Sequence, residues 1–377
     1  MQKSVTKFDQ VDSLRGIAAL MVIMVHANSF GEIQYFPSLL GKFVFQGGRG
    51  VQLFYILSAF TLFYTFDLRK GDFHSIRNFL IRRFFRIVPL YYFAIVAYLI
   101  CRWSQFSGQE NSYPSGWNII SNVFFFHGFS PFWINDLVPG GWSIGVEFPF
   151  YFLLPFLFSK IRTLADALRF QVWFIIIGAV LPVLMLQIKG IGTYDQWILF
   201  ILQFFPNHMA HFGFGIILYF LIIKQEIIAS QHFKYIYIIT ILYFAFACLS
   251  LYYLQYDWPA IVVVQSFWFS LGFSVIILLL FKDQKFKLNH PVLLFLGKIS
   301  YGLYLSHFFS FYLLDHFGLI ELLPGKSGGI SLLNFLLRFS LCLIISTCLS
   351  YILHLTIENP FQNLGKRLII KLNGQVN

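Results

Sequence analysis

Arg15 and His26 are the two residues whose types and spacing most clearly suggest chemistry. Both lie in one apolar stretch, with ten residues between them. At about 100° per helical residue, eleven steps return the chain to within roughly 20° of its starting direction, so the two side chains share one helix face. The helix rise places them ~16 Å apart along the axis. An ionisable residue inside a membrane is costly and usually faces a polar site in which it acts.

Glu147 is the only acidic residue well inside a predicted membrane span. It stands about two helical turns from the outer end of its span, by the helix pitch. It either pairs with a buried arginine or histidine for structural reasons, or it takes part in chemistry. Pro149 follows closely and can open a kink in the helix.

Ser300, Tyr304 and His307 are spaced so that they form one polar stripe on a helix. His307 is either a structural buried histidine or a functional one. Counted from the ends of their spans, His26, His307 and Glu147 reach a similar depth. We therefore expect these three side chains to converge.

A cluster of arginines stands at the start of the third predicted span, in Arg82-Arg83-Phe-Phe-Arg86. These residues either anchor the span among lipid headgroups or, with Arg15 at the same membrane level, bind a phosphorylated ligand. His208 and His211 share a helix face and could ligate a metal. Since no third ligand is identifiable, we predict no metal site.

The composition predicts an all-α integral membrane protein. The chain is 58% hydrophobic and 11% charged, whereas soluble domains carry about 25% charged residues. Its mean hydropathy is +0.71. Apolar runs long enough to cross a bilayer predict a bundle of about ten transmembrane helices. They lie near residues 14–30, 50–66, 86–102, 141–158, 171–187, 205–223, 235–254, 260–281, 293–314 and 332–355.

The distribution of lysine and arginine predicts that both termini are cytoplasmic, which requires an even number of spans. The net charge of +11 is then mostly a topology signal, and we expect no nucleic-acid partner, because no soluble basic domain is present. The four cysteines fall in or beside spans and suggest neither disulfides nor zinc. We predict a single membrane domain over residues 1–377, with no cleaved signal peptide.

Together, these motifs resemble the acyltransferase-3 family of membrane proteins, which O-acylate bacterial envelope and exported sugars. The matching pieces follow the family's order and span nearly the whole chain. They are Asp12-Ser-Leu-Arg15-Gly with His26, Gly50-Val-Gln-Leu-Phe-Tyr-Ile-Leu-Ser58-Ala-Phe60, Arg83-Phe-Phe-Arg86-Ile-Val-Pro89, Trp142-Ser143 with Glu147 and Tyr151, Ser300-Tyr-Gly-Leu-Tyr-Leu-Ser-His307, and Glu358-Asn-Pro360-Phe.

The chain departs from the family pattern at a few positions. Gln52 stands where the family typically has an acid, Ala59 stands where it has glycine, and Pro149 is unusual. The esterase-like domain that is fused to some members is not expected here.

The resemblance implies acetyl-CoA, or another acyl-CoA, as the cytoplasmic donor. It implies a lipid-linked or nascent envelope glycan, such as lipopolysaccharide O-antigen or exopolysaccharide, as the acceptor, and a place in the bacterial inner membrane among its lipids. Arg15, Arg82, Arg83 and Arg86 could bind the CoA phosphates.

His26 would remove the proton of the acceptor hydroxyl or carry the acyl group itself. Glu147 would orient His26 or position the sugar. Other polar side chains are candidates for lining the channel: Asp12, Ser143, Tyr151, Ser300, Tyr304 and His307.

Two other functions fit parts of this pattern. A transporter of a small metabolite or glycan would also use about ten helices and buried charges, although no paired broken spans mark inverted repeats. A structural subunit of a polysaccharide assembly complex would tolerate the loss of His26. The acceptor sugar, the acyl group and the oligomeric state stay open.

Overall fold

The computed structural model describes residues 8–32, 36–104, 114–188, 191–225, 259–283 and 287–374, and every regular element in these ranges is helical. This confirms the predicted all-α fold. The first elements are α1 (Asp9–Ser29), α2 (Ser38–Phe45), η2 (Gln46–Arg49), α3 (Gly50–Arg69), α4 (Ser75–Trp103), α5 (Gly116–Val123), η3 (His127–Phe129), α6 (Trp142–Lys160) and α7 (Leu164–Met185). They are followed by α8 (Tyr194–Gln203), α9 (Phe205–Ile222), α11 (Pro259–Lys282), α12 (Pro291–Lys298), α13 (Ser300–His316), α14 (Gly328–Leu353), η5 (His354–Glu358) and α15 (Asn359–Gly374).

Eight helices in the described ranges are long and apolar enough to cross a membrane, and the bent pair α12 and α13 makes a ninth if it is one span. These helices overlap nine of the ten predicted spans. The one remaining predicted span, 235–254, lies outside the described residues. The count of ten spans and the cytoplasmic placement of both termini therefore stay predictions. The pair α12 and α13 is bent by 80° at Ile299, whereas the sequence predicted one continuous span.

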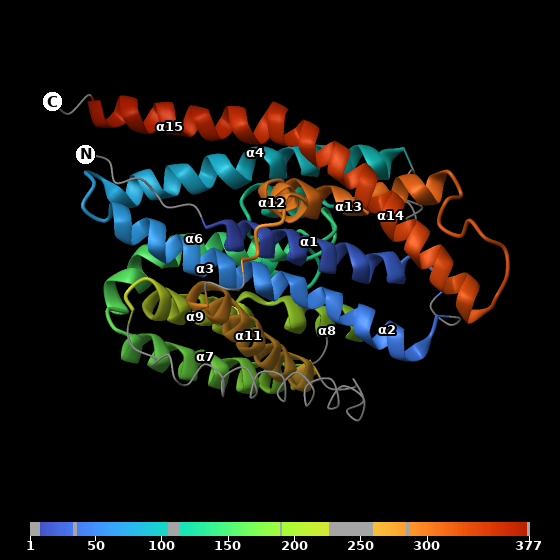
Figure 1. Cartoon of the computed structure of the whole chain (residues 1–377), viewed down its shortest axis with the longest axis horizontal. Helices are drawn as coiled ribbons and strands as arrows, with labels where there is room; N and C mark the ends of the chain where they lie inside the picture. Colours follow the sequence, from blue (N-terminus) through green and yellow to red (C-terminus); the bar gives the residue numbers. More distant parts are fainter. Residues whose placement is uncertain are drawn as a thin grey trace.

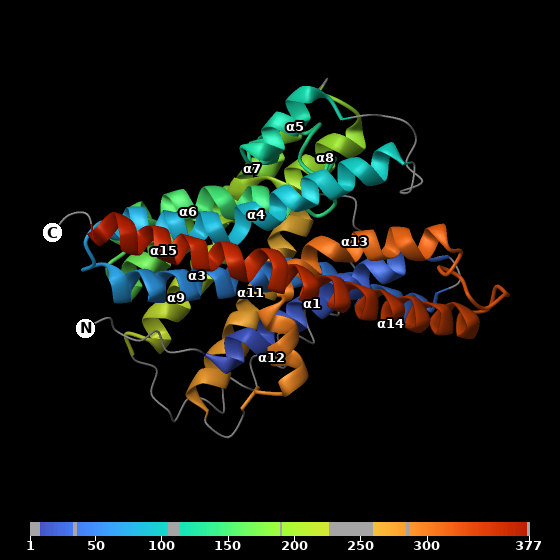
Figure 2. The same ribbon diagram turned by 90° about the horizontal axis from the view of Figure 1, so that it is seen from above.

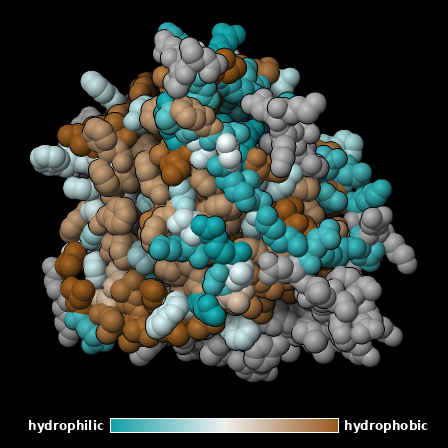
Figure 3. All heavy atoms as spheres, turned by 90° about the vertical axis from the view of Figure 1, so that its left-hand side faces the viewer, coloured by the Kyte–Doolittle hydropathy of each residue, from teal (hydrophilic) through white to brown (hydrophobic). Residues whose placement is uncertain are grey.

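The helices are arranged around α1 and α3, with α7, α9 and α11 on one side and α4, α14 and α15 on the other (Figures 1 and 2). We call the end of the bundle where α3, α6 and α15 stop the basal end. Exposed lysines and arginines gather there, and Figure 3 shows hydrophilic side chains across the middle of this end. The exposed basic side chains at or near the ends of α3, α6 and α9 and along the second half of α15 are Lys70, Lys160, Lys224, Lys366, Arg367 and Lys371.

Two glycines let α1 and α12 approach each other at backbone distance. A Cβ atom on Gly16 would lie 2.5 Å from the carbonyl oxygen of Leu293, and one on Gly297 would collide with the carbonyl oxygen of Asp12. Small residues allow this close packing between membrane helices. The position of α1, and of Arg15 on it, is therefore set by α12.

Pairs of serines join α13 to α14. The hydroxyl of Ser306 lies 3.1 Å from that of Ser350, and the hydroxyl of Ser310 lies 2.8 Å from that of Ser346. All four side chains are buried, and hydrogen bonds of this kind stabilise helix pairs in membranes. They fix the rotation of α13 about its axis.

A buried arginine fixes the far end of α1. Nε of Arg338 donates to the carbonyl oxygen of Ala27 at 2.5 Å, and its Nη1 donates to the carbonyl of Ile320 and the carboxylate of Glu321. The last carbonyl groups of a helix lack partners within that helix, and a cation there is also favoured by the helix dipole. Arg338 therefore holds in place the turn that carries His26.

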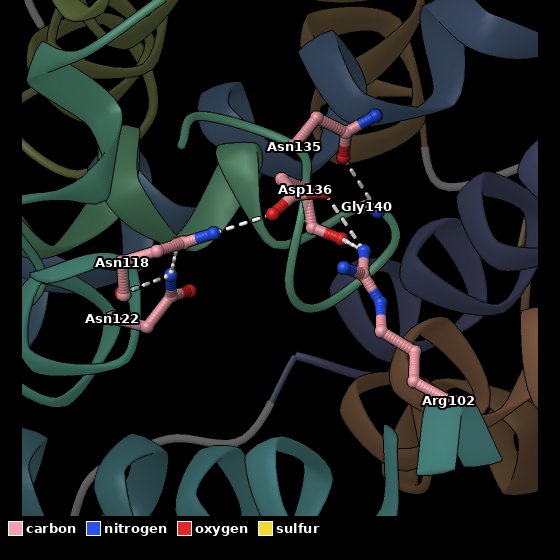
Figure 4. A network of polar contacts seen from close by, with 6 residues as sticks. All are labelled: Arg102, Asn118, Asn122, Asn135, Asp136 and Gly140. Carbon is pink, nitrogen blue, oxygen red and sulfur yellow. Dashed lines mark hydrogen bonds and ion pairs between the residues drawn. The ribbon is translucent and has the colours of Figure 1, made fainter. Parts of the chain in front are cut away.

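A polar network holds the segment that precedes α6 (Figure 4). The guanidinium of Arg102 at the end of α4 contacts the carboxylate of Asp136 at 2.9 Å. The other oxygen of that carboxylate accepts from the amide of Asn118 at 2.5 Å, and Asn135 accepts from the backbone N–H of Gly140 at 2.9 Å. Gly140 has a φ of +77°, a left-handed conformation that favours glycine. The network sets where α6 begins, and with it the direction of Glu147.

Candidate functional site

A cavity opens between α1, α3, α4, α6 and α13. It gathers most of the polar residues that the sequence singled out. Its wall contains Arg15, Arg83, Arg86, Ser143, Glu147, Tyr151, Ser300 and Tyr304, together with Val51, Phe54, Tyr55, Ser58, Thr61, Ile87, Ile144 and Tyr301.

Three guanidinium groups and one carboxylate line this cavity. Arg15 donates to Asp12 at 3.3 Å and to the hydroxyl of Thr61 at 3.1 Å. Among the described residues, Arg83 and Arg86 have no hydrogen bond or ion pair. Since guanidinium groups favour bidentate contact with carboxylates and phosphates, the wall is suited to an anionic ligand.

Glu147 accepts a hydrogen bond from the hydroxyl of Ser58 at 2.5 Å. Within the described part of the chain, no hydrogen bond or ion pair joins Glu147 to His26. The carboxylate therefore belongs to the cavity wall. There its negative charge attracts the guanidinium groups of Arg15 and Arg83. It is placed to position a ligand in the cavity.

His26 lies beside His307. Their ring centroids are 5.2 Å apart, and the ring of Phe308 is 4.4 Å from that of His26. His26 is half-buried and His307 is fully buried. Neither residue is part of the cavity wall.

Tyr304 lies between the cavity and this histidine pair. It lines the cavity, its ring centroid is 5.7 Å from that of His307, and its hydroxyl donates to the carbonyl of Gly140 at 3.0 Å. The predicted stripe of Ser300, Tyr304 and His307 is therefore divided. Its first two members face the cavity, and the third faces His26.

Other residues that the sequence singled out lie outside the cavity wall. Arg82 interacts electrostatically with Arg69 and Asp72, while Asp12 acts through its ion pair with Arg15. His208 hydrogen-bonds the carbonyl of Leu202 at 3.0 Å, and His211 lies 2.8 Å from the hydroxyl of Ser270. Gln52 is buried in α3.

A second hollow opens beside the connection between α13 and α14, at the end of the bundle opposite the basal end (Figure 1). Glu32 follows His26 by six residues and lies just past the end of α1. His26 therefore stands between the two hollows on one stretch of chain. The second hollow is lined by Glu32, Glu321, Leu323, Pro324, Gly325, Lys326 and Ser331.

Some cavity residues were not singled out from the sequence as site residues. Tyr301 adjoins Ser300, and its hydroxyl donates to the carbonyl of Ile87 at 2.9 Å. Ser58 and Thr61 are one turn apart on α3, and Ser58 stands in a stretch that resembles the family. The polar spacing on α3 is the signal that could have revealed these two residues.

His127 precedes α6 outside the spans and supports its first turn. Its Nε2 lies 3.0 Å from the carbonyl oxygen of Gly141 and 3.3 Å from the hydroxyl of Tyr91. Burial lowers the pKa of His127 to about 4, because the charged form loses its hydration. At neutral pH this ring is therefore uncharged.

Comparison with known proteins gives one family. A family described as an acyltransferase domain, acyltransferase-3, matches residues 8–355. An uncharacterized protein of Aquifex aeolicus (strain VF5) is 26% identical over 255 residues, which cover 63% of this chain and 92% of that protein. No solved structure matches.

Proposed function

The chain belongs to the acyltransferase-3 family of multi-pass membrane proteins, and on that premise we propose that it acylates an envelope glycan. The donor is acetyl-CoA or a related acyl-CoA, and the acceptor is a hydroxyl group of a sugar such as that of lipopolysaccharide O-antigen or exopolysaccharide. The membrane is the bacterial inner membrane. The observation that carries this proposal is the arginine-lined cavity beside the His26 helix.

The cavity supports an acyl-CoA donor. Its wall offers Arg83 and Arg86 from α4, which lack polar partners in the described part of the chain, and Arg15 from α1. The phosphates of CoA are the kind of group that guanidinium forks bind. With the phosphates near Arg15, the pantetheine arm would extend along α1 toward His26, ~16 Å away by the helix rise.

The second hollow supports an acceptor that approaches from the other side. The carboxylates of Glu32 and Glu321 and the side chains of Lys326 and Ser331 are groups that hydrogen-bond sugar hydroxyls. The basic residues at the basal end favour a cytoplasmic position for that end. The donor cavity would then face the cytoplasm and the acceptor hollow the opposite side.

The transfer itself needs one base. The neutral ring of His26 accepts the proton of the acceptor hydroxyl while the oxygen attacks the thioester carbonyl. The C–S bond breaks, the new C–O ester bond forms, and the imidazolium returns the proton to the CoA sulfur. If His26 itself attacks first, an acyl-histidine forms and the sugar hydroxyl then displaces it.

The proposal is tested with purified protein in lipid nanodiscs, acetyl-CoA labelled in the acetyl group, and envelope glycan extracted from cells that lack the gene. We expect label in the glycan and one free CoA thiol per acetyl group transferred. His26→Ala should remove both signals without reducing insertion, while His316→Gln, an exposed change at the end of α13, should keep them. If the wild-type protein releases no thiol but moves a solute across the bilayer, the protein is a transporter and the proposal is wrong.

A further inference from the structure

One ring nitrogen of His307 makes a hydrogen bond, and the other makes none with a described residue. Its Nδ1 lies 2.6 Å from the carbonyl oxygen of Tyr304. A carbonyl oxygen can only accept, so Nδ1 carries the proton and Nε2 presents a lone pair. Nε2 is buried, and no described residue makes a hydrogen bond to it. A buried acceptor without a partner is costly, which indicates that this nitrogen is kept for a contact of functional value.

The ring of His26 lies beside the ring that carries this nitrogen. The two rings are 5.2 Å apart between centroids and inclined by 33°. At this separation an N–H of one imidazole can reach a nitrogen of the other, either directly or through one water molecule. Phe308 packs against both rings, at 4.4 Å from each, and so limits how His26 can turn.

We propose that His307 is the positioning residue for His26, in the role that the sequence suggested for Glu147. An N–H of His26 donates to Nε2 of His307, which fixes the tautomer and the direction of the His26 ring. The other nitrogen of His26 then holds its lone pair toward the acceptor. This inference rests on the proposed function, because it assigns a role within the same transfer.

The surroundings of His307 are built to hold it still. The serine pairs between α13 and α14 lie on either side of His307 in the sequence, at Ser306 and Ser310. The hydroxyl of Tyr304, one turn earlier, is bound to the carbonyl of Gly140. A positioning residue needs such support, because a loosely held partner does not orient a base.

Proton accounting is consistent with this arrangement. During transfer, His26 gains the hydroxyl proton and then gives it to the CoA sulfur. Throughout, the N–H that points at His307 stays in place, and the lone pair of His307 stabilises the transient imidazolium. His307 itself gains and loses no proton.

The pairing is tested first without reference to activity. We expect ¹⁵N spectra of histidine-labelled protein in nanodiscs at pH 7.5 to show a single neutral tautomer for His26, identified by the signals that disappear in His26→Gln. In His307→Phe the His26 signals should shift to a mixture of the two tautomers, whereas His316→Gln should leave them unchanged. Spectra of His26 that do not change in His307→Phe would refute the pairing, whatever the protein transfers.

Kinetics then distinguish positioning from channel lining. For His307→Phe we expect kcat to fall at least 100-fold while KM for acetyl-CoA stays within about twofold, the pattern of an interaction that matters in the transition state. His307→Gln, which keeps an acceptor group, should recover part of the loss. An unchanged kcat with a raised KM for the glycan would assign His307 to the channel and overturn the proposal. If the wild-type protein transfers nothing, the proposed function fails, while the spectra still decide the pairing.

Discussion

The charge of the cavity leads to a prediction about Arg83 and Arg86. Because neither makes an ion pair with a described residue, replacing one by methionine should leave no carboxylate unpaired and should not impair insertion. A hydrogen bond to a charged group contributes about 1.5–3 kcal/mol. Loss of one arginine should therefore raise KM for acetyl-CoA by about 10- to 150-fold, with 1.4 kcal/mol per factor of ten.

S-acetylpantetheine provides the matched control, because it carries the thioester but not the phosphates. The wild-type protein should have a high KM for this donor, and Arg83→Met or Arg86→Met should change it by less than about twofold. The assay is release of free thiol at a fixed concentration of envelope glycan. If the variants raise KM equally for both donors, the arginines do not contact phosphate and the argument from the cavity is wrong.

Three further predictions concern the frame of the site. Gly297→Ala should sharply reduce the amount of folded protein in size-exclusion chromatography. The added Cβ would collide with the carbonyl oxygen of Asp12, and that oxygen belongs to the backbone of α1, which cannot move aside as a side chain can. A normal yield of folded protein would contradict the close packing of α1 against α12. Arg338→Met should cost about 1–3 kcal/mol of stability for each backbone carbonyl that loses its donor, namely those of Ala27 and Ile320, and should lower the thermal midpoint. Lys326→Met at the exposed rim should not lower it. Equal midpoints in the two variants would show that Arg338 does not hold the end of α1 in place. Since the pKa of His127 is lowered to about 4 from about 6.5 when unfolded, the unfolded state binds the proton first, and stability should fall by up to about 3 kcal/mol as the pH drops from about 6.5 to 4. His127→Gln should flatten part of that fall in pH-dependent thermal scans, and an identical slope would refute the assignment.

Hydropathy was enough to locate the nine predicted spans that fall within the described residues, because crossing a bilayer requires long apolar runs wherever they occur in the chain. It did not show the break at Ile299, since the sequence is apolar on both sides of it. The overlong last helix was only partly predicted. The sequence predicted a span near 332–355, whereas the helical stretch runs over Gly328–Gly374, and its last part is too polar to be detected as a span.

For the site, the sequence could predict how deep each residue lies in the membrane, but not which neighbouring helix its side chain faces. Span boundaries put His26, His307 and Glu147 at one level, and the first two are indeed adjacent. Glu147 faces the cavity instead, because the rotation of α6 depends on contacts such as those of Gly140 and His127 that no periodicity encodes. Arg338 was missed for a related reason, since two of its partners are backbone carbonyl groups.

The most direct test of the central claim, that His26 serves acyl transfer to an envelope glycan, is mass spectrometry of those glycans from cells. Glycans are compared from cells without the gene, with the wild-type gene and with His26→Ala at equal membrane levels. We predict a mass increase of one acyl group per modified sugar with the wild-type gene alone. The same increase with His26→Ala, or none in any glycan fraction with the wild-type gene, would contradict the account.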